Sequence, residues 1–268
     1  DENSGLQPAV LYFRDSLLTG IDDTKNGWYS TDERIVQEEG LRMAIRPYKP
    51  KDRRPIASRE RRIWKRMAAF LAARRISPNA ISITGMIFGI VSGILFAATQ
   101  FSHNEHIHRL LWSAAAACIL IRLLANMMDG MVAVLSKRAS PYGELYNELT
   151  DRVSDIAIII GAGYAVGGWP ALGYIAAGVA ILTAYIRAVG NAAGVYNLFI
   201  GPMAKPQRMV ILITAGALMA VVPRQWQPFW GGAGWGIVAI GLGIIIIGGS
   251  ITIVRRLRLI IAYQRSRK

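Results

Sequence analysis

Long apolar segments dominate the chain between residues 78 and 260, and each is long enough to form a membrane-spanning helix. A helix needs about 20 residues to cross a hydrocarbon core of roughly 30 Å. Six segments meet this requirement, near residues 78–99, 109–135, 148–168, 170–196, 206–223 and 233–260. The pattern predicts an all-α integral membrane protein with six transmembrane helices.

The stretch 58–75 shows a different pattern, in which apolar residues recur at helical spacing among many bases. Ile63, Met67, Phe70 and Leu71 fall on one face of a helix, whereas most of the bases fall elsewhere. We therefore expect a basic amphipathic helix that lies in the membrane interface, near anionic head groups, and precedes the six spans. An ordinary solvated helix is the alternative.

The composition fits a membrane protein better than other classes of protein. The 268 residues are 53% hydrophobic and 18% charged, which excludes a disordered chain, and the single Cys118 excludes a disulfide scaffold. The formal net charge of +14 would suggest nucleic acid as the partner of a soluble protein. Because the bases flank long apolar segments, we expect membrane lipids as partners and no nucleic acid.

Charge divides the chain into two parts and predicts how it lies in the membrane. Residues 1–55, acidic and then basic, are expected to form a cytoplasmic N-terminal segment, and residues 56–268 the membrane domain. Bases gather before the first span, after the second, before the fifth and after the sixth. The positive-inside rule then predicts that both termini and the end of the second span are cytoplasmic. We expect the membrane to be a bacterial inner (plasma) membrane.

Acidic residues of the membrane region are almost confined to one stretch. Beyond residue 75 the chain has six acids, and five of them lie between residues 129 and 155. On helices, Asn126 and Asp129 are neighbours, and Asn147, Asp151 and Asp155 share one face at intervals of four. Two antiparallel helices joined by a short basic turn would bring these two stripes of oxygen atoms together.

This stretch favours a metal and a phosphate-bearing ligand. Oxygen ligands that include carboxylates suit Mg²⁺, Mn²⁺ or Ca²⁺, and not zinc or copper. The small residues Gly130, Ala133 and Gly143 would let a flat or phosphate-bearing ligand approach the backbone. The alternative is a structural network in which the acids pair with arginines. The candidate partners are Arg122, Arg152 and Arg187.

The stretch resembles the signature of a known family. It reads Asn126-x2-Asp129-Gly130-x2-Ala133, nine residues, and then Gly143-x3-Asn147-Glu148-x2-Asp151-x3-Asp155. The signature of the CDP-alcohol phosphotransferase (CDP-alcohol phosphatidyltransferase) family is similar: Asp-x2-Asp-Gly-x2-Ala-Arg, about eight residues, Gly-x3-Asp-x3-Asp. The Ser77-Pro78-Asn79 start of the first span also resembles the family's Thr/Ser-Pro-Asn opening. The resemblance covers roughly residues 56–262 and implies six transmembrane helices after an amphipathic interfacial helix.

The resemblance implies an enzyme of phospholipid biosynthesis that uses Mg²⁺ or Mn²⁺ in a two-metal site. Such an enzyme transfers a phosphatidyl-type (substituted phosphate) group from a CDP-linked lipid to an alcohol and releases CMP. Asp151 would be a metal ligand and the general base, and Asp129 a ligand that also helps to hold the nucleotide. Gly130, Ala133 and Gly143 would line the cytidine site. A homodimer is implied as well.

The sequence departs from the signature at three positions. Asn126 and Asn147 stand at the first and third aspartates, and Val134 stands at the arginine, a pattern that resembles one branch of the family. Amide oxygens still bind hard cations, although more weakly than carboxylates, so we expect a higher metal requirement. Glu148 and Asp155 are expected to restore the missing charge as further metal ligands.

Several bases near this stretch are candidates for binding an acceptor or a lipid phosphate. They are Lys137, Arg138, Arg187, Lys205 and Arg208. Anchoring to head groups explains Lys205 and Arg208 equally well. If both face the acids together with Arg187, the expected acceptor is a phosphorylated alcohol.

Two other functions stay open. A family member in which Asn126 and Asn147 have weakened or removed turnover would still bind the CDP-linked lipid. A divalent-cation transporter would use Asp129, Asp151 and Asp155 as its permeation site. It is disfavoured because no acid lies on the far half of any predicted span, whereas a transport path has to reach the other face.

Overall fold

The structure, a computed structural model, describes residues 61–136, 141–196, 198–223, 226–227 and 235–266. The elements of this part are seven α-helices and one short 3₁₀ helix, so the predicted all-α class is confirmed there. The predicted segment 1–55 and its boundary lie outside the described residues. The elements are α3 (Arg62–Ala73), α4 (Pro78–Ala98), η3 (Thr99–Phe101), α5 (Glu105–Leu135), α6 (Pro141–Gly163), α7 (Pro170–Ala192), α8 (Lys205–Val221) and α9 (Ile237–Ser266).

Four of the six predicted spans are long and apolar enough to cross a membrane. They are Pro78–Phe101, Glu105–Leu135, Pro170–Ala192 and Ile237–Ser266. Helices α6 and α8 occupy the places of the other two predicted spans. Helix α6 carries the acids of the candidate site, and α8 has only 17 residues. These two helices carry the buried acids Asp151 and Asp155 and the buried base Arg208.

Two helices begin earlier than the apolar pattern predicts. Helix α5 begins at Glu105 instead of near residue 109, because Asn104 caps it by accepting hydrogen bonds from the backbone N–H groups of His106 and Ile107 at 2.9 and 3.3 Å. Helix α6 begins at Pro141 instead of near residue 148, and proline suits the first turn of a helix. Hydropathy misses both starts because the first turns are polar.

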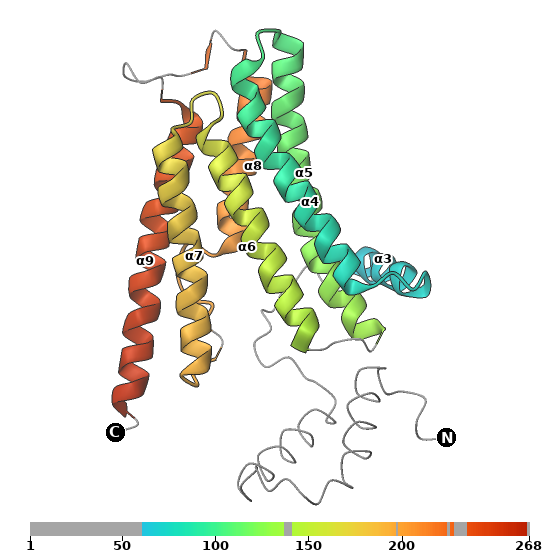
Figure 1. The fold of residues 1–268 in the computed structure, drawn as a ribbon, viewed down its shortest axis with the longest axis vertical. Helices are drawn as coiled ribbons and strands as arrows, with labels where there is room; N and C mark the ends of the chain where they lie inside the picture. Colours follow the sequence, from blue (N-terminus) through green and yellow to red (C-terminus); the bar gives the residue numbers. More distant parts are fainter. Residues whose placement is uncertain (1–60, 137–140, 197, 224–225, 228–234, 267–268) are drawn as a thin grey trace, which may run out of the picture. The chain divides into compact units, whose positions relative to one another are not determined.

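The helices pack as one bundle in which α6 lies between α4 and α7 (Figure 1). Helix α4 packs against α5 and α6, α7 packs against α6 and α9, and α8 packs against α5 and α9. Glycines allow the closest approach, since a Cβ atom at Gly93 would collide with the Ala157 carbonyl and one at Gly161 with the Gly93 backbone. The α4–α6 contact therefore depends on these small residues.

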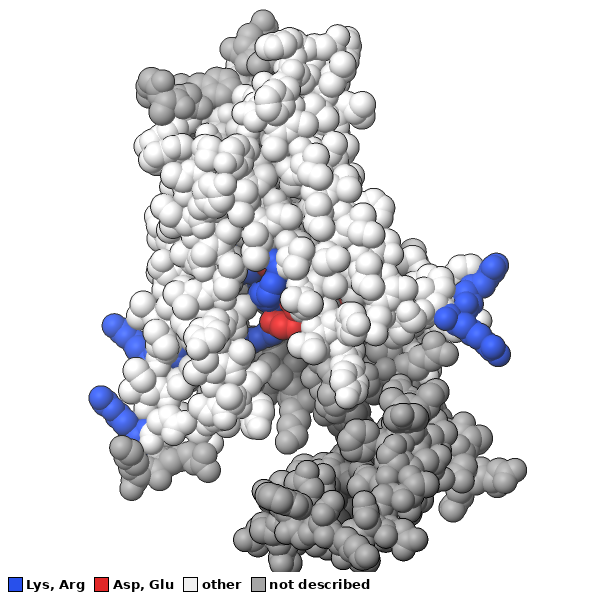
Figure 2. All heavy atoms as spheres, in the orientation of Figure 1, with Lys and Arg blue, Asp and Glu red and all other residues white. Residues whose placement is uncertain are grey.

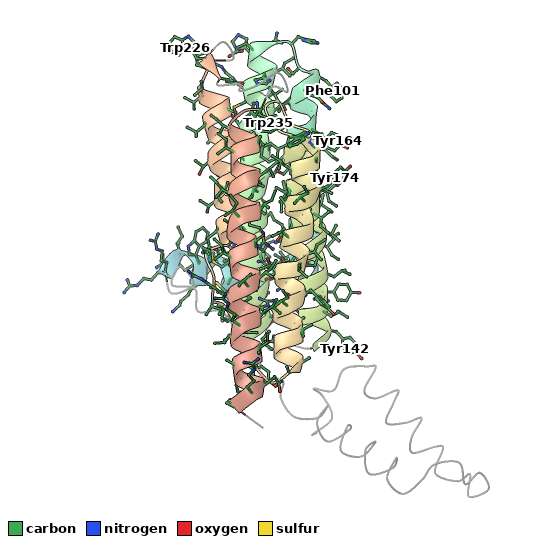
Figure 3. The ribbon with its side chains drawn as sticks, turned by 90° about the vertical axis from the view of Figure 1, so that its left-hand side faces the viewer. Phe101, Tyr142, Tyr164, Tyr174, Trp226 and Trp235 are labelled. Atoms are coloured by element: carbon green, nitrogen blue, oxygen red, sulfur yellow. The ribbon has the colours of Figure 1, made fainter. Side chains whose placement is uncertain are left out.

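Helix α3 is inclined away from the long axis of the bundle (Figures 1 and 3). Its Ala68 is buried, and Trp64 packs against a cluster that includes Met127 and Met131 of α5. Its apolar residues are not all covered, because Ile63 and Phe70 stay exposed. The helix predicted over 58–75 is thus present from Arg62 to Ala73, and its place in a membrane interface stays a prediction.

The glycine contact predicts opposite effects for two Gly→Ala substitutions. Gly93→Ala should lower the melting temperature of the detergent-solubilised protein by several degrees, because overpacking typically costs about 1–3 kcal/mol. Gly178→Ala in α7 is the matched control, since its Cβ atom would meet no neighbour within 4 Å. Alanine is the better helix former, so the control should melt at the same temperature or higher. Equal melting temperatures for the two variants would contradict the role given to Gly93.

Candidate active site

Asp151 of α6 is the centre of the charged cluster in the bundle. The residue is only 6% exposed, and its carboxylate contacts the Arg122 guanidinium of α5 and the Lys205 ammonium of α8 through the same oxygen, Oδ1. Arg122 is held a second time, because its Nε donates a hydrogen bond to Ser154 Oγ at 2.8 Å. One buried carboxylate thus joins three helices.

Asp155 lies one turn further along α6 and forms a second buried pair. Arg208 of α8 donates from Nη2 to Asp155 Oδ2 at 2.7 Å, and Lys205 Nζ lies 3.8 Å from Asp155 Oδ1. Arg208 and Asp155 are both buried. Lys205 therefore lies between two carboxylates of α6. Lys205 and Arg208 thus both face the acids, and their binding of an acceptor or lipid phosphate stays a prediction.

Asp129 of α5 is the third buried acid, and α4 helps to position it. Ser82 Oγ of α4 donates a hydrogen bond to Asp129 Oδ2 at 2.6 Å, and the backbone N–H of Gly130 donates to Oδ1 at 2.5 Å. The carboxylates of Asp129 and Asp151 are near enough to interact electrostatically. One acid of each predicted stripe is thus near the other, and the meeting of the complete stripes stays a prediction.

Glu148 lies at the more open end of the cluster on α6. It accepts a hydrogen bond from Arg152 at 2.7 Å and one from Arg187 of α7 at 3.0 Å. The pairs offered by the structural alternative, with Arg122, Arg152 and Arg187, are therefore present. Charged side chains meet in the middle of one face of the molecule, below a wide uncharged region (Figure 2).

The oxygen donors at the signature positions fit a hard divalent cation. They are Asn126, Asp129, Asn147 and Asp151. Asn147 Oδ1 is buried and accepts no hydrogen bond from the described residues, and a buried acceptor usually has a partner. The described part holds no group of three or more His, Cys, Asp or Glu side chains placed to bind a metal. A divalent ion here would therefore depend on amide oxygens as well as carboxylates.

The remaining predicted site residues differ in how much the structure shows of them. Gly130 and Ala133 are half-buried on α5, and Gly143 is half-buried on α6. Lys137 and Arg138 lie outside the described residues. Glu148 and Asp155 each meet two cations, so their role as metal ligands, which needs these contacts to break, stays a prediction.

Two contributors to the site were not predicted, namely Ser82 and Ser154. Ser82 follows the Ser77-Pro78-Asn79 motif by a few residues on the first span, but serine in an apolar helix gives no signal of its own. Ser154 lies between Asp151 and Asp155, so the sequence places it near the site, but the sequence does not show that its hydroxyl accepts a hydrogen bond from Arg122.

A comparison of the sequence with known protein families shows which family the chain belongs to. The sequence model of the CDP-alcohol phosphatidyltransferase family matches residues 75–249, a range that includes every residue of the cluster described above. The chain belongs to this family. It is therefore a membrane-embedded transferase of phospholipid biosynthesis, and the resemblance seen in the signature is confirmed.

Two relatives support this assignment over most of their length. The inner membrane protein YnbA of Escherichia coli (strain K12) is 23% identical over 171 residues, which are 64% of this chain and 81% of that protein. The phosphatidylinositol phosphate synthase of Streptomyces avermitilis is 24% identical over 205 residues, which are 73% of this chain and 76% of that enzyme.

Solved structures of the Mycobacterium tuberculosis phosphatidylinositol phosphate synthase (PgsA1) have the same fold. The structure with CDP-DAG bound gives a TM-score of 0.59 at 20% identity and covers 75% of this chain and 94% of that chain. The complex with manganese and citrate gives a TM-score of 0.59 at 19% identity and covers 74% and 88%. The described bundle is thus the fold of this family.

Proposed function

We propose that this enzyme transfers a phosphatidyl-type group from a CDP-linked lipid to a phosphorylated alcohol and releases CMP. The observation that carries the proposal is the position of the half-buried Lys205 and the buried Arg208, which lie against Asp151 and Asp155 of the signature helix. Arg187 contacts Glu148 on the same helix. Three bases near one set of acids provide positive charge where a phosphorylated acceptor would bind.

The relatives support the donor and the type of acceptor. The Mycobacterium tuberculosis phosphatidylinositol phosphate synthase has been solved with CDP-DAG bound, and the relative from Streptomyces is also a phosphatidylinositol phosphate synthase. Their names point to a CDP-linked lipid as the donor and a phosphorylated alcohol as the acceptor. For this chain both assignments are part of the proposal.

Asn126, Asp129, Asn147 and Asp151 would hold Mg²⁺ or Mn²⁺, and the resemblance to the family predicts a two-metal site. When bound, divalent cations stabilise the negative charge on the attacking and leaving oxygens of a phosphoryl-type transfer. The buried acceptor Asn147 Oδ1 supports this assignment. A manganese complex is known for the relative from Mycobacterium tuberculosis.

In the proposed reaction the acceptor hydroxyl attacks the phosphorus that carries the lipid. Asp151 accepts the hydroxyl proton, the new phosphorus–oxygen bond forms, and the bond from phosphorus to the CMP oxygen breaks. Gly130, Ala133 and Gly143 would line the cytidine, since side chains this small leave room for the base. CMP leaves and the product is a phosphodiester lipid.

Before substrate binds, the bases of the site are held by acids. Lys205 contacts Asp151 and Asp155, Arg208 contacts Asp155, and Arg187 contacts Glu148. Substrate phosphates would compete with these carboxylates for the same cations. Glu148 and Asp155 then have a defined task even if they do not bind a metal, because they position the bases that receive phosphate.

The main alternative is a protein that keeps the CDP-lipid site but turns over slowly or not at all, because two carboxylates are amides. Metal-dependent CMP release decides between the two. A cation transporter would instead carry metal across liposome membranes without any nucleotide. The homodimer expected from the family resemblance stays a prediction.

The first prediction for the proposed activity concerns Asp151. With CDP-diacylglycerol, Mg²⁺ or Mn²⁺ and a panel of alcohols and phosphorylated alcohols, the purified protein should release CMP with a phosphorylated acceptor. Asp151→Asn should lower this rate by about 10²-fold or more, since a well-placed general base typically contributes about 10²–10⁴-fold.

Glu105→Gln is the matched control for that experiment. Glu105 begins α5, at the end opposite Asp129, and pairs with Arg109, so its loss should leave CMP release unchanged. Binding of CDP-diacylglycerol without CMP release across the whole panel would reject the transferase proposal in favour of the inactive alternative.

A second prediction tests the acceptor class through Arg187. The side chain is partly exposed and pairs with Glu148, so Arg187→Gln should fold normally. If Arg187 binds the acceptor phosphate, this variant should raise KM for the phosphorylated alcohol about tenfold or more, the range expected when a charged hydrogen bond of about 1.5–3 kcal/mol is lost. KM for CDP-diacylglycerol should change much less. Equal changes in both constants would reject this role.

We also propose the orientation in which the site faces the cytoplasm of a bacterial cell. Exposed aromatic residues gather at the end of the bundle away from the bases of the candidate site, where Phe101, Tyr164, Trp226 and Trp235 lie (Figure 3). Tyr142 lies near the other end. Aromatic side chains favour both membrane interfaces, and bases favour the cytoplasmic one.

Cysteine labelling tests this orientation, because Cys118 is buried and gives little background. His103→Cys, near the aromatic end, should react with a membrane-impermeant maleimide in intact cells. Arg258→Cys on α9, at the basic end, should react only after permeabilisation. Both positions are exposed on the protein, so the reverse pattern would overturn the proposed orientation.

A further inference from the structure

The balance of charge at the signature differs from what two divalent ions require. Two of the four signature positions carry neutral amides, Asn126 and Asn147, so only Asp129 and Asp151 contribute negative charge. Arg122 and Lys205 contact Asp151 directly. The protein thus provides two positive charges where an intact signature would offer four carboxylates to two metal ions.

We propose that Arg122 and Lys205 take the place of one of the two divalent ions, so that this site binds a single ion. The inference rests on the proposed function in one respect, because it takes the pyrophosphate of a CDP-linked lipid as the ligand. Of the four signature donors that the family resemblance assigns to two ions, the single ion would use Asp129 and the amide oxygens of Asn126 and Asn147, and Asp151 would keep only its role as the general base. Arg122 and Lys205 would supply the remaining positive charge.

The sum of charges favours one ion. The two signature carboxylates and the two cations cancel, and the Asp155–Arg208 pair is neutral by itself. Glu148 with Arg152 and Arg187 adds one positive charge at the more open end of the cluster, where water screens it. The pyrophosphate of a CDP-linked lipid brings two negative charges, one on each phosphate. One divalent ion neutralises it, whereas a second would leave two uncompensated positive charges. In a buried site, where water screens little, such an excess is costly.

The geometry gives the two cations fixed positions. Arg122 is 1% exposed and is held by Asp151 and by Ser154 at 2.8 Å. Its Nη1 atom is buried and makes no hydrogen bond with the described residues, so one donor of this guanidinium stays unused. Lys205 approaches Asp151 from a different helix. Both cations contact Oδ1 of Asp151, so a divalent ion could use this oxygen only if they moved away.

The buried oxygen of Asn147 points to the place of the single ion. Asn147 Oδ1 makes no hydrogen bond with the described residues, in contrast to Asp151 Oδ1, which already meets two cations. A buried acceptor that no described residue satisfies is available to a metal ion. This contrast divides the site in two. Asn147 belongs to the part that would hold the metal ion, and Asp151 belongs to the part that Arg122 and Lys205 occupy.

Counting bound manganese tests the proposal without relying on turnover. The full chain in detergent, saturated with CDP-diacylglycerol, is titrated with Mn²⁺, and electron paramagnetic resonance measures the free ion. The wild-type protein should bind one Mn²⁺ per chain. Binding of two ions, or of none, would overturn the proposal.

A triple variant provides the converse test. Asn126→Asp, Asn147→Asp and Lys205→Met together restore the carboxylates and remove one cation, so this protein should bind two Mn²⁺ per chain. Lys65→Met, on the exposed part of α3, is the matched control and should bind one. A folded triple variant that binds CDP-diacylglycerol but only one Mn²⁺ would refute the assignment. If the triple variant does not fold, the wild-type count decides.

The failure of this inference differs from the failure of the proposed function. Two bound ions together with CMP release would reject the single-ion site and leave the transferase intact. One bound ion without CMP release for any acceptor would reject the transferase and leave the single-ion site intact.

Discussion

The contact of one buried carboxylate with two cations from different helices is the interaction on which the site depends. Asp151 of α6 meets Arg122 of α5 and Lys205 of α8. Removing one partner from a buried ion pair generally costs roughly 3–5 kcal/mol, because the remaining charge is left without compensation. The three helices are therefore held in the arrangement that satisfies Asp151, and α6 can carry polar residues inside an otherwise apolar bundle.

Packing and electrostatics support each other at this point. A Cβ atom at Gly89 of α4 would collide with Ser154, the residue that accepts a hydrogen bond from Arg122. The absence of a side chain at Gly89 thus lets α4 approach α6 beside the ion pair. The same contact continues to Gly93 and Gly161. Small residues on α4 therefore serve the site indirectly, because they allow the helix with the acids to be buried.

The charged groups around Asp151 connect the chemistry of the family with the substitutions at the signature of this chain. Enzymes that handle pyrophosphate need positive charge that is fixed before the reaction begins. Divalent ions can provide it, and so can arginine and lysine when buried carboxylates hold them in place. Asn126 and Asn147 reduce the negative charge available to metals, and Arg122 and Lys205 add positive charge at the same site. Membership in the family gives the reaction class. The balance of acids and bases at the signature distinguishes this chain from members that have the intact signature.

The sequence by itself determined the helical class, the family and the residues at the signature, because hydropathy and fixed spacing are local properties. The start of α4 at Pro78 matches the predicted start, since Ser77 accepts a hydrogen bond from the Ala80 N–H. Only the tertiary structure decided which base meets which acid. Asp151 lies 54 residues from Lys205 and 29 from Arg122, and no periodicity relates positions on different helices. Ser82 became part of the site for the same reason, because a hydrogen bond to Asp129 requires α4 and α5 to be packed side by side.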